Sequence, residues 1–331
     1  MGSPEQQSIF DLPTRTPTTK KTAAHSARSG TFTDNMKLPV HRWFRYSAGF
    51  SAEWVESVLK NHNAGTVLDP FVGSGTVCVA ADKMGITSYG IEAHPFVFRL
   101  GQGKLSWGEN IDDFGAAISK LKALAEKIRD SVSLSEANAL ILKCYSEDSL
   151  RDLYSIKAAY LKLANSWPAS INSLVFLSVN SILRATSHVG TAQWQYILPN
   201  KTKARVISPY DALELQAKMM MSDMGTMQGA SASSKAVLLP TDSRTLCGVP
   251  DNSIDLVITS PPYANNYDYA DATRLEMSFW GEINDWGDLH GTVRQYLICS
   301  SSQHASKDKM KLAELLADPA IDPIKEELTK V

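Results

Sequence analysis

The sequence predicts an α/β fold, in which a parallel sheet of about four strands is combined with a mostly helical insert. Two observations lead to this prediction. Between residues 66 and 93, an apolar extended run, a Gly-rich turn, a helical stretch and a second extended run follow one another, and this alternation is typical of a parallel α/β unit. Strand character returns only near residue 236, after a long stretch whose apolar residues recur at helical spacing.

Composition places the chain among ordinary globular proteins. It has 331 residues, of which 44% are apolar and 21% charged, and a formal net charge of −2. These values suit one large domain or two modest ones, and they exclude collagen-like, wholly disordered and disulfide-scaffold proteins. The four cysteines form no CxxC pair, so neither a metal site nor a disulfide framework is predicted.

Membrane and export signals are not evident in the sequence. Residues 1–36 lack the apolar core of a signal peptide, and no window approaches the roughly 18 consecutive apolar residues of a membrane span. We therefore expect a cytoplasmic protein without a membrane partner.

The first hundred residues are expected to begin with a tail and to continue with two strands. Residues 1–36 are rich in Ser, Thr, Pro, Lys and Arg without apolar periodicity, which predicts a flexible basic tail. Structure is expected to start near Leu38, and Ser51 is a candidate N-cap for the first long helix. The elements that follow are a strand over 66–71, a helix over 76–84 and a strand over 88–93.

The middle of the chain, residues 111–231, is predicted to be a helical insert. Apolar spacing indicates helices over 111–132, 150–163, 171–183 and 216–224. An irregular basic loop with aromatic residues is predicted over 190–209, and a linker of small residues over 225–234. Strands are expected again over 236–239 and 254–259, followed by helices over 270–280 and 308–316.

Charge is unevenly distributed along the insert. From Leu153 to Tyr210 the sequence has six Lys and Arg residues but no Asp or Glu, so this stretch carries +6 in a chain of net charge −2. Such a segment either balances acidic surfaces of the same fold or contacts a polyanion.

A Gly-rich motif, DPFVGSGT at residues 69–76, follows the first predicted strand. Gly73 and Gly75 let the backbone approach a ligand closely, and the helix that starts at Thr76 points its N-terminus at that ligand. The motif lacks the GxGxxG pattern of dinucleotide folds and the GK[ST] of phosphate-binding P-loops. By itself it fits any nucleotide-like ligand, or a structural turn.

Two acidic residues stand at the ends of other predicted strands. Glu92 ends the second strand, where a carboxylate can accept hydrogen bonds from both ribose hydroxyls of an adenosyl ligand. Asp242 follows the strand over 236–239 and could accept a hydrogen bond from an adenine amino group. The alternatives are a solvated strand-end charge for Glu92 and a turn cap for Asp242.

The motif TSPPY, residues 259–263, directly follows the last predicted strand. Two consecutive prolines cannot continue a paired central strand, so the chain must leave the sheet in a stiff, exposed turn. In that turn, the Ser260 hydroxyl and the Pro261 carbonyl can accept hydrogen bonds from an exocyclic amino group, while the Tyr263 ring stacks on the base that carries it. The alternative is a plain proline-rich loop.

Together, DPFVGSGT and TSPPY resemble the motifs of amino-methyltransferases that use S-adenosylmethionine, and most closely those of DNA methyltransferases acting on cytosine N4 or adenine N6. The resemblance covers roughly residues 38–110 and 232–282. It implies a Rossmann-like methyltransferase sheet, S-adenosylmethionine as cofactor, double-stranded DNA as partner and methylation of a flipped base, as in restriction-modification. A serine before the two prolines is commoner among N4-cytosine enzymes, so cytosine N4 is favoured over adenine N6.

The resemblance also assigns roles by position. The implied cofactor-binding residues are Phe50, Ser51, Asp69, Phe71, Gly73, Gly75, Thr76, Glu92 and Asp242. The implied catalytic residues are Ser260, Pro261, Pro262 and Tyr263. Amino-group methylation needs no covalent intermediate, and the chain has no Pro-Cys dipeptide of the kind that supplies the thiolate in C5-cytosine enzymes. The implied organisation is a basic tail over 1–36, a cofactor-binding half over 37–110, the insert over 111–231, a catalytic half over 232–300 and a helical segment over 301–331.

The basic insert gains a function from this resemblance. An enzyme that flips a base must hold the duplex by its phosphates, and the insert lies between the cofactor-binding and catalytic halves. The predicted phosphate contacts are Lys201, Lys203 and Arg205, and Trp194 or Gln195 is predicted to reach bases.

The sequence departs from the resemblance after Tyr263. The family's sheet implies seven strands, whereas four are visible, and the remaining 68 or so residues have the pattern of helices and loops. We expect that a second polypeptide, or a missing C-terminal part, completes the sheet beside the strand before TSPPY, because a bare apolar edge invites aggregation. The competing interpretations are an RNA amino-methyltransferase and a non-catalytic DNA-binding or regulatory subunit of the same fold.

Overall fold

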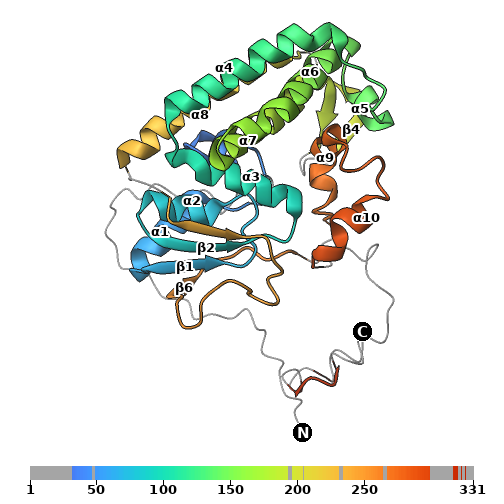
Figure 1. Ribbon diagram of the computed structural model, residues 1–331. Helices are drawn as coiled ribbons and strands as arrows, with labels where there is room; N and C mark the ends of the chain where they lie inside the picture. The colour runs from blue at the N-terminus through green and yellow to red at the C-terminus, as the bar shows by residue number, and fades with distance from the viewer. Residues whose placement is uncertain are drawn as a thin grey trace, which may run out of the picture.

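A sheet of four parallel strands lies at the centre of the computed structural model, which describes residues 32–46, 49–192, 196–203, 205–230, 234–263, 267–298, 316–319, 322 and 325. The strand order is β5-β2-β1-β6 (Figure 1). The strands are β1 Thr66–Asp69, β2 Thr87–Ile91, β5 Ala236–Leu239 and β6 Leu256–Val257. The predicted α/β, Rossmann-like fold with about four strands is confirmed.

Parallel pairing brings the carboxyl ends of these strands to one edge of the sheet. β1 pairs with β2 through Leu68 and Tyr89, and with β6 through Leu68 and Val257. β2 pairs with β5 through Ile91 and Leu239. Residues that follow the strands therefore meet at this edge, although they come from distant parts of the chain.

The N-terminal part of the chain forms three helices around β1 and β2: α1 Ala52–His62, α2 Thr76–Lys83 and α3 Pro95–Leu105. The predicted N-cap is confirmed, since Ser51 Oγ accepts a hydrogen bond from Trp54 N at 3.3 Å. A small core joins α1 and α2 to β1 and to the end of β6; its buried residues are Val55, Leu59, Val67, Val77, Ala80, Ala81 and Ile258.

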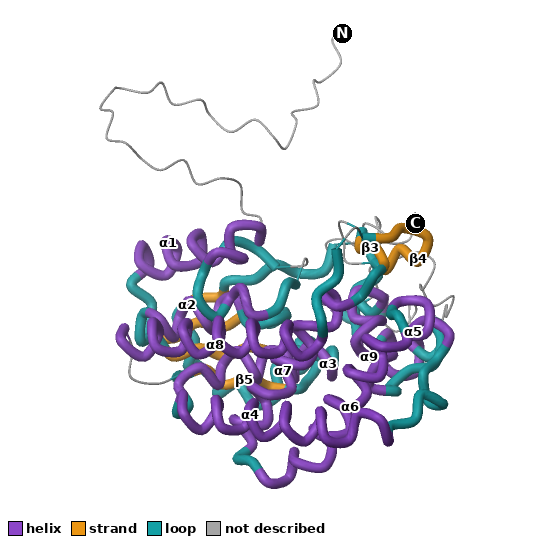
Figure 2. The backbone as a smooth tube through the Cα atoms, turned by 90° about the horizontal axis from the view of Figure 1, so that it is seen from above, coloured by secondary structure: helices purple, strands orange, loops and turns teal. Residues whose placement is uncertain are grey.

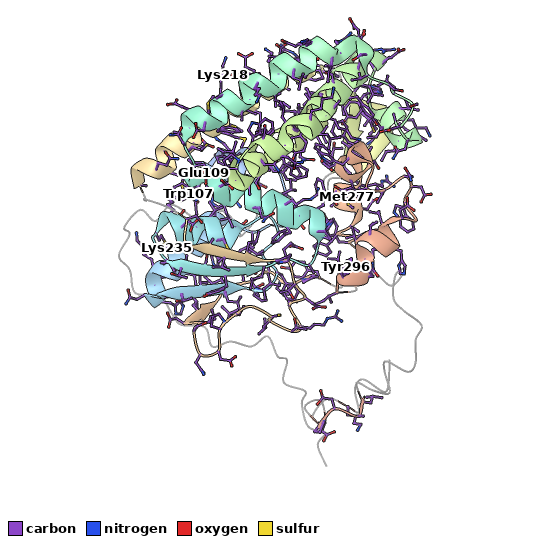
Figure 3. All side chains as sticks on the ribbon, viewed as in Figure 1. Trp107, Glu109, Lys218, Lys235, Met277 and Tyr296 are labelled. Atoms are coloured by element: carbon purple, nitrogen blue, oxygen red, sulfur yellow. The ribbon has the colours of Figure 1, made fainter. Side chains whose placement is uncertain are left out.

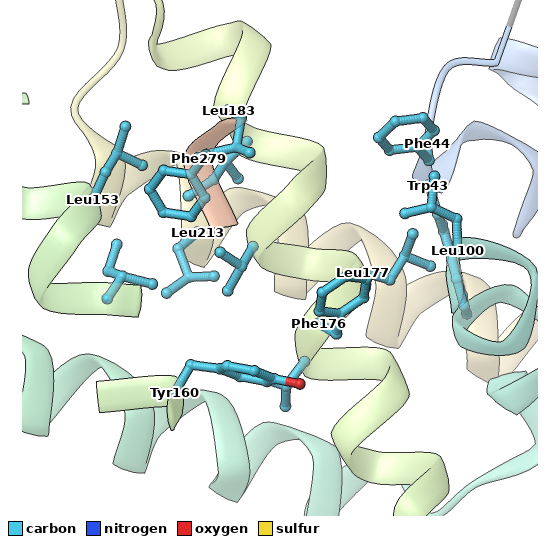
Figure 4. Packing of buried hydrophobic residues seen from close by; sticks show 14 of the residues in the cluster. Trp43, Phe44, Leu100, Leu153, Tyr160, Phe176, Leu177, Leu183, Leu213 and Phe279 are labelled. Carbon is cyan, nitrogen blue, oxygen red and sulfur yellow. The ribbon is translucent and has the colours of Figure 1, made fainter. Parts of the chain in front are cut away.

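The insert forms a layer of helices over α3 (Figures 1 and 2). Its helices are α4 Ile111–Ile128, α5 Ala139–Cys144, α6 Glu147–Leu163, α7 Ala169–Thr186 and α8 Pro209–Ala230. A larger core, shown in part in Figure 4, includes Leu100 of α3, Leu153, Leu183 and Leu213 of the insert, and Phe279 near the end of the described chain. Because these residues belong to one cluster, the insert packs as part of the domain.

Shorter segments connect these elements. They are η1 Phe32–Lys37, η2 His41–Trp43, η3 Ser106–Gly108, η4 Arg129–Ser131, η5 Ala164–Ser166, η6 Asp271–Thr273, α9 Arg274–Trp280, α10 Leu289–Thr292 and η7 Arg294–Tyr296. Within the described ranges, no helix has both the length and the apolar character needed to cross a membrane. Most of the predicted tail and of the helix over 308–316 lie outside the described residues.

The segment 190–209, predicted to be an irregular loop, contains an antiparallel hairpin of β3 Val189–Thr191 and β4 Ile197–Thr202. The pairing register shifts between Val189 and Gly190. A Cβ atom at Gly190 would lie 3.0 Å from Lys201 Cβ, so the missing side chain permits close approach of the strands. Two short strands with such an irregularity have no clear alternation of polar and apolar residues, which explains why the prediction was wrong.

The predicted linker over 225–234 is helical in its first part, because α8 continues to residue 230. Met227 is buried, and Gln228 Nε2 donates hydrogen bonds to the carbonyl oxygens of Trp107 (2.9 Å) and Glu109 (2.8 Å), both labelled in Figure 3. These tertiary contacts offset the low helix propensity of the glycines in this stretch.

The described structure begins with η1 at Phe32, inside the predicted tail and before Leu38. Asn35 Nδ2 donates to the carbonyl oxygen of Phe50 (2.8 Å), and Asn35 Oδ1 accepts from Ala52 N (2.8 Å). These contacts tie η1 to the start of α1, and local composition does not reveal them.

Asp223 of α8 joins the N-terminal segment to the insert. Its side chain is buried, and Oδ2 accepts hydrogen bonds from Val40 N (3.1 Å), Trp43 Nε1 (2.9 Å) and Arg42 Nε (3.0 Å). One carboxylate therefore satisfies a backbone donor, an indole and a guanidinium in the same place.

Replacing Asp223 by Ala is expected to lower the free energy of unfolding by about 3 kcal/mol, because a guanidinium and two N–H groups lose their buried acceptor. Urea unfolding followed by circular dichroism measures the change. Ser222→Ala, at the exposed neighbouring position of α8, is the control and should alter stability by less than about 0.5 kcal/mol. Equal losses in the two variants would contradict the role given to Asp223.

Candidate functional site

A pocket opens at the carboxyl edge of the sheet. Its concave space is about 550 Å³, including the part open to solvent. Of the residues predicted to form a site, four line this pocket: Phe71, Glu92, Asp242 and Pro262. Residues not predicted to bind anything also line it, among them Tyr46, His94, Tyr269 and Tyr296, the last of which is labelled in Figure 3.

Asp69 lies at the end of β1, directly before the pocket residues Pro70 and Phe71. Its carboxylate is fully buried, and Oδ1 accepts hydrogen bonds from Phe71 N (3.0 Å) and Thr259 Oγ1 (2.8 Å). Oδ2 is buried without a hydrogen-bond partner in the described part of the chain. Burial raises the pKa of Asp69 to about 7, against the effect of its two hydrogen bonds. Asp69 therefore keeps one unused acceptor beside the pocket.

The Gly-rich turn closes tightly after Asp69. Gly73 and Gly75 have φ of 55° and 94°, a region that other L-residues rarely adopt. A Cβ atom at Gly73 would also lie 2.9 Å from the ring of Tyr46, so a side chain there would displace a pocket wall. Gly75 is the N-cap of α2, which begins at the predicted Thr76, and the helix N-terminus therefore faces this turn.

Lys104 supports the turn from inside the protein. Its side chain is buried, and Nζ donates hydrogen bonds to Ser74 Oγ (3.2 Å) and to the carbonyl oxygen of His41 (3.1 Å). Burial lowers the pKa of Lys104 to about 7. The ammonium group thus links the Gly-rich turn to the N-terminal segment.

Glu92 follows β2 and faces the pocket. Its Oε1 accepts a hydrogen bond from His94 N at 2.7 Å. Burial raises the pKa of Glu92 to about 7, although hydrogen bonds from the backbone of His94 and Gly73 oppose the shift. His94 is itself buried, with Nε2 at 3.0 Å from Thr273 Oγ1, and burial lowers its pKa to about 3. The imidazole is therefore neutral at physiological pH.

Asp242 follows β5 and holds an arginine. Asp242 Oδ1 accepts hydrogen bonds from Arg244 N and Arg244 Nε, both at 2.9 Å, and the guanidinium also contacts Oδ2. These hydrogen bonds lower the pKa of Asp242. The carboxylate lines the pocket and is also the cap of its own turn, so both interpretations made from the sequence are compatible with the structure.

Residues 259–263, called the SPPY turn below, leave the sheet after β6 as predicted. Pro262 lines the pocket, Ser260 is half-buried, and the Tyr263 side chain is 61% exposed. Tyr263 N donates a hydrogen bond to Tyr269 Oη at 3.1 Å. The exposed tyrosine ring and the acceptors of the turn therefore stand beside a pocket formed by the other strands.

Two predicted cofactor residues lie elsewhere in the described structure. Ser51 is buried and caps α1, while the Phe50 ring packs edge-on against Trp54, with ring centroids 5.8 Å apart. Neither lines the pocket in the part of the chain described. Their neighbour Tyr46 occupies that wall instead, and its only signal in the sequence is membership of an aromatic-rich segment.

The three basic residues predicted to contact phosphates differ in exposure. Lys201 and Arg205 are exposed, whereas Lys203 Nζ donates a hydrogen bond to the carbonyl oxygen of Arg184 at 2.5 Å and burial lowers its pKa. Trp194 and Gln195 lie outside the described residues.

The pocket residues suit an adenosyl ligand such as S-adenosylmethionine. A buried acceptor without a partner in the described chain, Asp69 Oδ2, stands beside the Gly-rich turn, and the desolvated carboxylate of Glu92 accepts a hydrogen bond from the backbone of Gly73 in the same turn. Both groups would be stabilised by a ligand that brings hydrogen-bond donors or positive charge. The described residues contain no cluster of His, Cys, Asp and Glu that could hold a metal ion.

The raised pKa values of Asp69 and Glu92 predict how stability depends on pH. In the unfolded chain such carboxyls titrate near pH 4, so between about pH 4 and 7 the folded state binds more protons and these two groups make stability fall as pH rises. Asp69→Asn keeps an acceptor for Phe71 N but removes this titration, so its unfolding free energy should fall less between pH 5 and 7 than that of the wild type.

Denaturant unfolding at pH 5, 6 and 7 measures the difference between variant and wild type. Glu92→Gln is the matched variant and should remove a similar part of the dependence. If the unfolding free energy of both variants depends on pH in the same way as that of the wild type, the raised pKa values of Asp69 and Glu92 are refuted.

Comparison with known proteins gives related methyltransferases. A family model described as DNA methylase, of the N6/N4 type, matches residues 4–102. The chain is 25% identical over 281 residues to the type II methyltransferase M.BsoBI of Geobacillus stearothermophilus, covering 75% of this chain and 54% of that protein. It is 24% identical over 281 residues to M.AvaI of Nostoc sp., covering 76% and 56%.

A shorter match is 43% identical over 68 residues to the type II methyltransferase M.MjaII of Methanocaldococcus jannaschii, covering 20% of this chain and 13% of that protein. No solved structure gives a significant match. The chain spans about half the length of M.BsoBI and M.AvaI. This α/β protein is therefore similar to DNA methylases of the N6/N4 type over residues 4–102, and to type II methyltransferases over about three quarters of its length.

Proposed function

We propose that the chain acts as a DNA methyltransferase, alone or as part of a larger enzyme, and transfers a methyl group from S-adenosylmethionine to an exocyclic amino group of a base. Cytosine N4 is favoured over adenine N6, because serine precedes the two prolines of the SPPY turn. The observation that carries the proposal is the meeting of Glu92, Asp242 and the SPPY turn in one pocket, beside the buried Asp69. Similarity to type II methyltransferases supports it.

The cofactor is proposed to bind through three carboxylates at the strand ends. Asp69 Oδ2 has no partner in the described structure and suits a cationic nitrogen; Glu92 would accept from the ribose hydroxyls, and Asp242 from the adenine amino group. Phe71, Gly73, Gly75 and Thr76 would shape the surrounding wall. When bound, S-adenosylmethionine supplies a methyl group activated by a positively charged sulfur.

The SPPY turn is proposed to hold the target base. Ser260 Oγ and the Pro261 carbonyl would accept the amino hydrogens, which turns the nitrogen lone pair out of the ring plane. Tyr263 is exposed and can stack on the base. Thr259 Oγ1 donates to Asp69 Oδ1 at 2.8 Å, so the base-binding turn and the cofactor-binding carboxylate hold a fixed relation. The amino proton can leave to solvent after transfer.

Double-stranded DNA is the proposed substrate, and the hairpin β3–β4 is the proposed phosphate-binding surface. Lys201 and Arg205 are exposed on and just after β4. Lys203 Nζ donates a hydrogen bond to the carbonyl of Arg184, so we assign it to holding the end of the hairpin against α7 and not to a phosphate contact.

We further propose that additional polypeptide covers the edge of the sheet at β6. β6 has a partner strand on its β1 side in the described structure, and Val257 on it is 54% exposed. An apolar parallel edge of this kind is normally covered. The chain's span of about half of M.BsoBI and M.AvaI fits the same proposal.

Methyl transfer from isotopically labelled S-adenosylmethionine to DNA or RNA, followed by mass analysis of the nucleosides, tests the function. The expected product is N4-methylcytosine in DNA. Tyr263→Ala should lower the transfer rate at least about a hundredfold with cofactor binding retained, whereas Asp69→Ala should weaken cofactor binding, measured by calorimetry.

Other outcomes separate the alternatives. Transfer of label to RNA would favour an RNA methyltransferase. DNA binding without any binding of S-adenosylmethionine would favour a non-catalytic subunit. If the chain transfers no methyl group, either alone or with any candidate completing polypeptide, the proposal that it is part of a methyltransferase is refuted.

Charge reversal tests the proposed DNA surface. The double variant Lys201→Glu, Arg205→Glu should weaken DNA binding and reduce the slope of log affinity against log salt by about 2, because each phosphate contact releases about one counterion. Fluorescence anisotropy over a range of salt concentrations gives both values. Lys120→Glu, on the exposed face of α4, is the control; equal slopes in the double variant and the wild type would exclude this surface.

A further inference from the structure

The hairpin of the insert touches the loop that follows the SPPY turn. Tyr196, the residue before β4, accepts a hydrogen bond at Oη from Asp268 N, at 2.9 Å. The Tyr196 ring also lies against Tyr267, with ring centroids 5.7 Å apart. Two independent contacts therefore join the hairpin to this loop.

The contact continues to the SPPY turn itself. Tyr267 packs at right angles on Tyr269, with ring centroids 4.5 Å apart, and Tyr269 Oη accepts a hydrogen bond from Tyr263 N at 3.1 Å. Tyr267 is buried, and Tyr269 lines the cofactor pocket. Three tyrosine rings thus connect the hairpin with the backbone of the residue proposed to stack on the base.

The hairpin end of this connection is held rigidly. Tyr196 O accepts a hydrogen bond from Ala192 N at 2.8 Å, which closes the hairpin. At its base, Lys203 N donates to the carbonyl of His188 at 2.8 Å, and His188 N donates to the carbonyl of Cys144 at 3.0 Å. The hairpin is therefore fixed to the end of α5, and its backbone hydrogen bonds hold Tyr196 in place.

The loop also has an anchor of its own beyond the tyrosines. Asp268 Oδ1 accepts from Ala270 N at 3.1 Å, and its carboxylate pairs with Arg294 at 2.6 Å. This ion pair holds the side chain of Asp268, whereas Tyr196 contacts the backbone N–H of the same residue and the ring of Tyr267, which leads to the SPPY turn. Loss of Tyr196 should therefore loosen the turn without unfolding the loop.

We propose that Tyr196 is a positioning residue for the SPPY turn, and that the hairpin couples nucleic-acid contact to the placement of Tyr263. The proposal rests on the proposed function for its catalytic meaning. Lys201 lies on the same hairpin as Tyr196, so force exerted by a duplex on β4 reaches the turn through the tyrosine rings. An insert that holds DNA thereby also aligns the residue that receives the base.

Hydrogen exchange read by mass spectrometry tests the coupling without any need for activity. In Tyr196→Leu, the exchange of the peptide containing Tyr263 N–H should become at least about tenfold faster, while peptides of β1 and α2 keep their rates. Tyr196→Phe, which keeps the ring and loses only the acceptor for Asp268 N, should have a smaller effect. Tyr210→Phe is the matched control, since the Tyr210 hydroxyl is bonded to Ser155 Oγ at 2.7 Å elsewhere in the insert.

Kinetics test its catalytic meaning in the active enzyme, with any completing polypeptide present. Tyr196→Leu should lower kcat about tenfold and leave the affinity for S-adenosylmethionine within twofold of the wild type, and Tyr196→Phe should recover most of the loss. If Tyr196→Leu and Tyr210→Phe lose similar stability, and hydrogen exchange becomes faster throughout the protein in both, then Tyr196 has only a structural role. That result would overturn the proposal.

The two proposals fail in different ways. A wild-type protein that transfers no methyl group with any partner refutes the function, while exchange at Tyr263 still decides the coupling. Normal transfer together with unchanged exchange in Tyr196→Leu overturns the positioning role alone.

Discussion

The pairing of β1 with β2 on one side and β6 on the other is the constraint on which the site depends. It brings residues separated by most of the chain to one edge of the sheet. The hydrogen bond between Thr259 Oγ1 and Asp69 Oδ1 then joins the ends of β1 and β6 directly. Because the Gly-rich turn and the SPPY turn both start from these strand ends, their relative positions are set by the sheet and not by the flexibility of either loop.

The same edge concentrates groups that lose water on folding. Asp69 and Glu92 have pKa values raised to about 7, and the pKa of His94 is lowered to about 3, each chiefly through burial. A protein pays for such desolvation in stability, and a ligand with complementary donors relieves the cost. The desolvation of these groups and the proposed binding of a cationic adenosyl ligand at the same edge are thus two aspects of one arrangement.

Local signals were sufficient for much of this fold. The strand, glycine turn and helix around Asp69 could be predicted because backbone conformation there depends on residues next to one another, and the Ser51 cap was found for the same reason. The SPPY turn was predicted from the stiffness of consecutive prolines. The meeting of Glu92 with Asp242 follows from parallel topology, which limits where strand-end residues can lie, whereas the order of the strands was not predicted.

Contacts between distant residues could not be predicted in this way. Tyr46 reaches the pocket because its ring fills the space beside a side-chain-free Gly73, and no periodicity marks that role. The hairpin β3–β4 was missed because its strands are short and irregular, and the contact of Lys203 Nζ with the carbonyl of Arg184 has no signal in the local sequence. Phe50 and Ser51, assigned to the cofactor by resemblance, have structural contacts in the described chain.

The position of the insert also has a consequence for how the chain folds. β2 and β5 are neighbours in the sheet, yet the entire helical layer lies between them in sequence. Closing that pair requires the ends of a very long segment to meet, which costs chain entropy until the helices have collapsed and shortened the distance. Completing the carboxyl edge by the β2–β5 pair therefore carries a loop-closure cost much larger than that of the β1–β2 pair, whose strands are close in sequence.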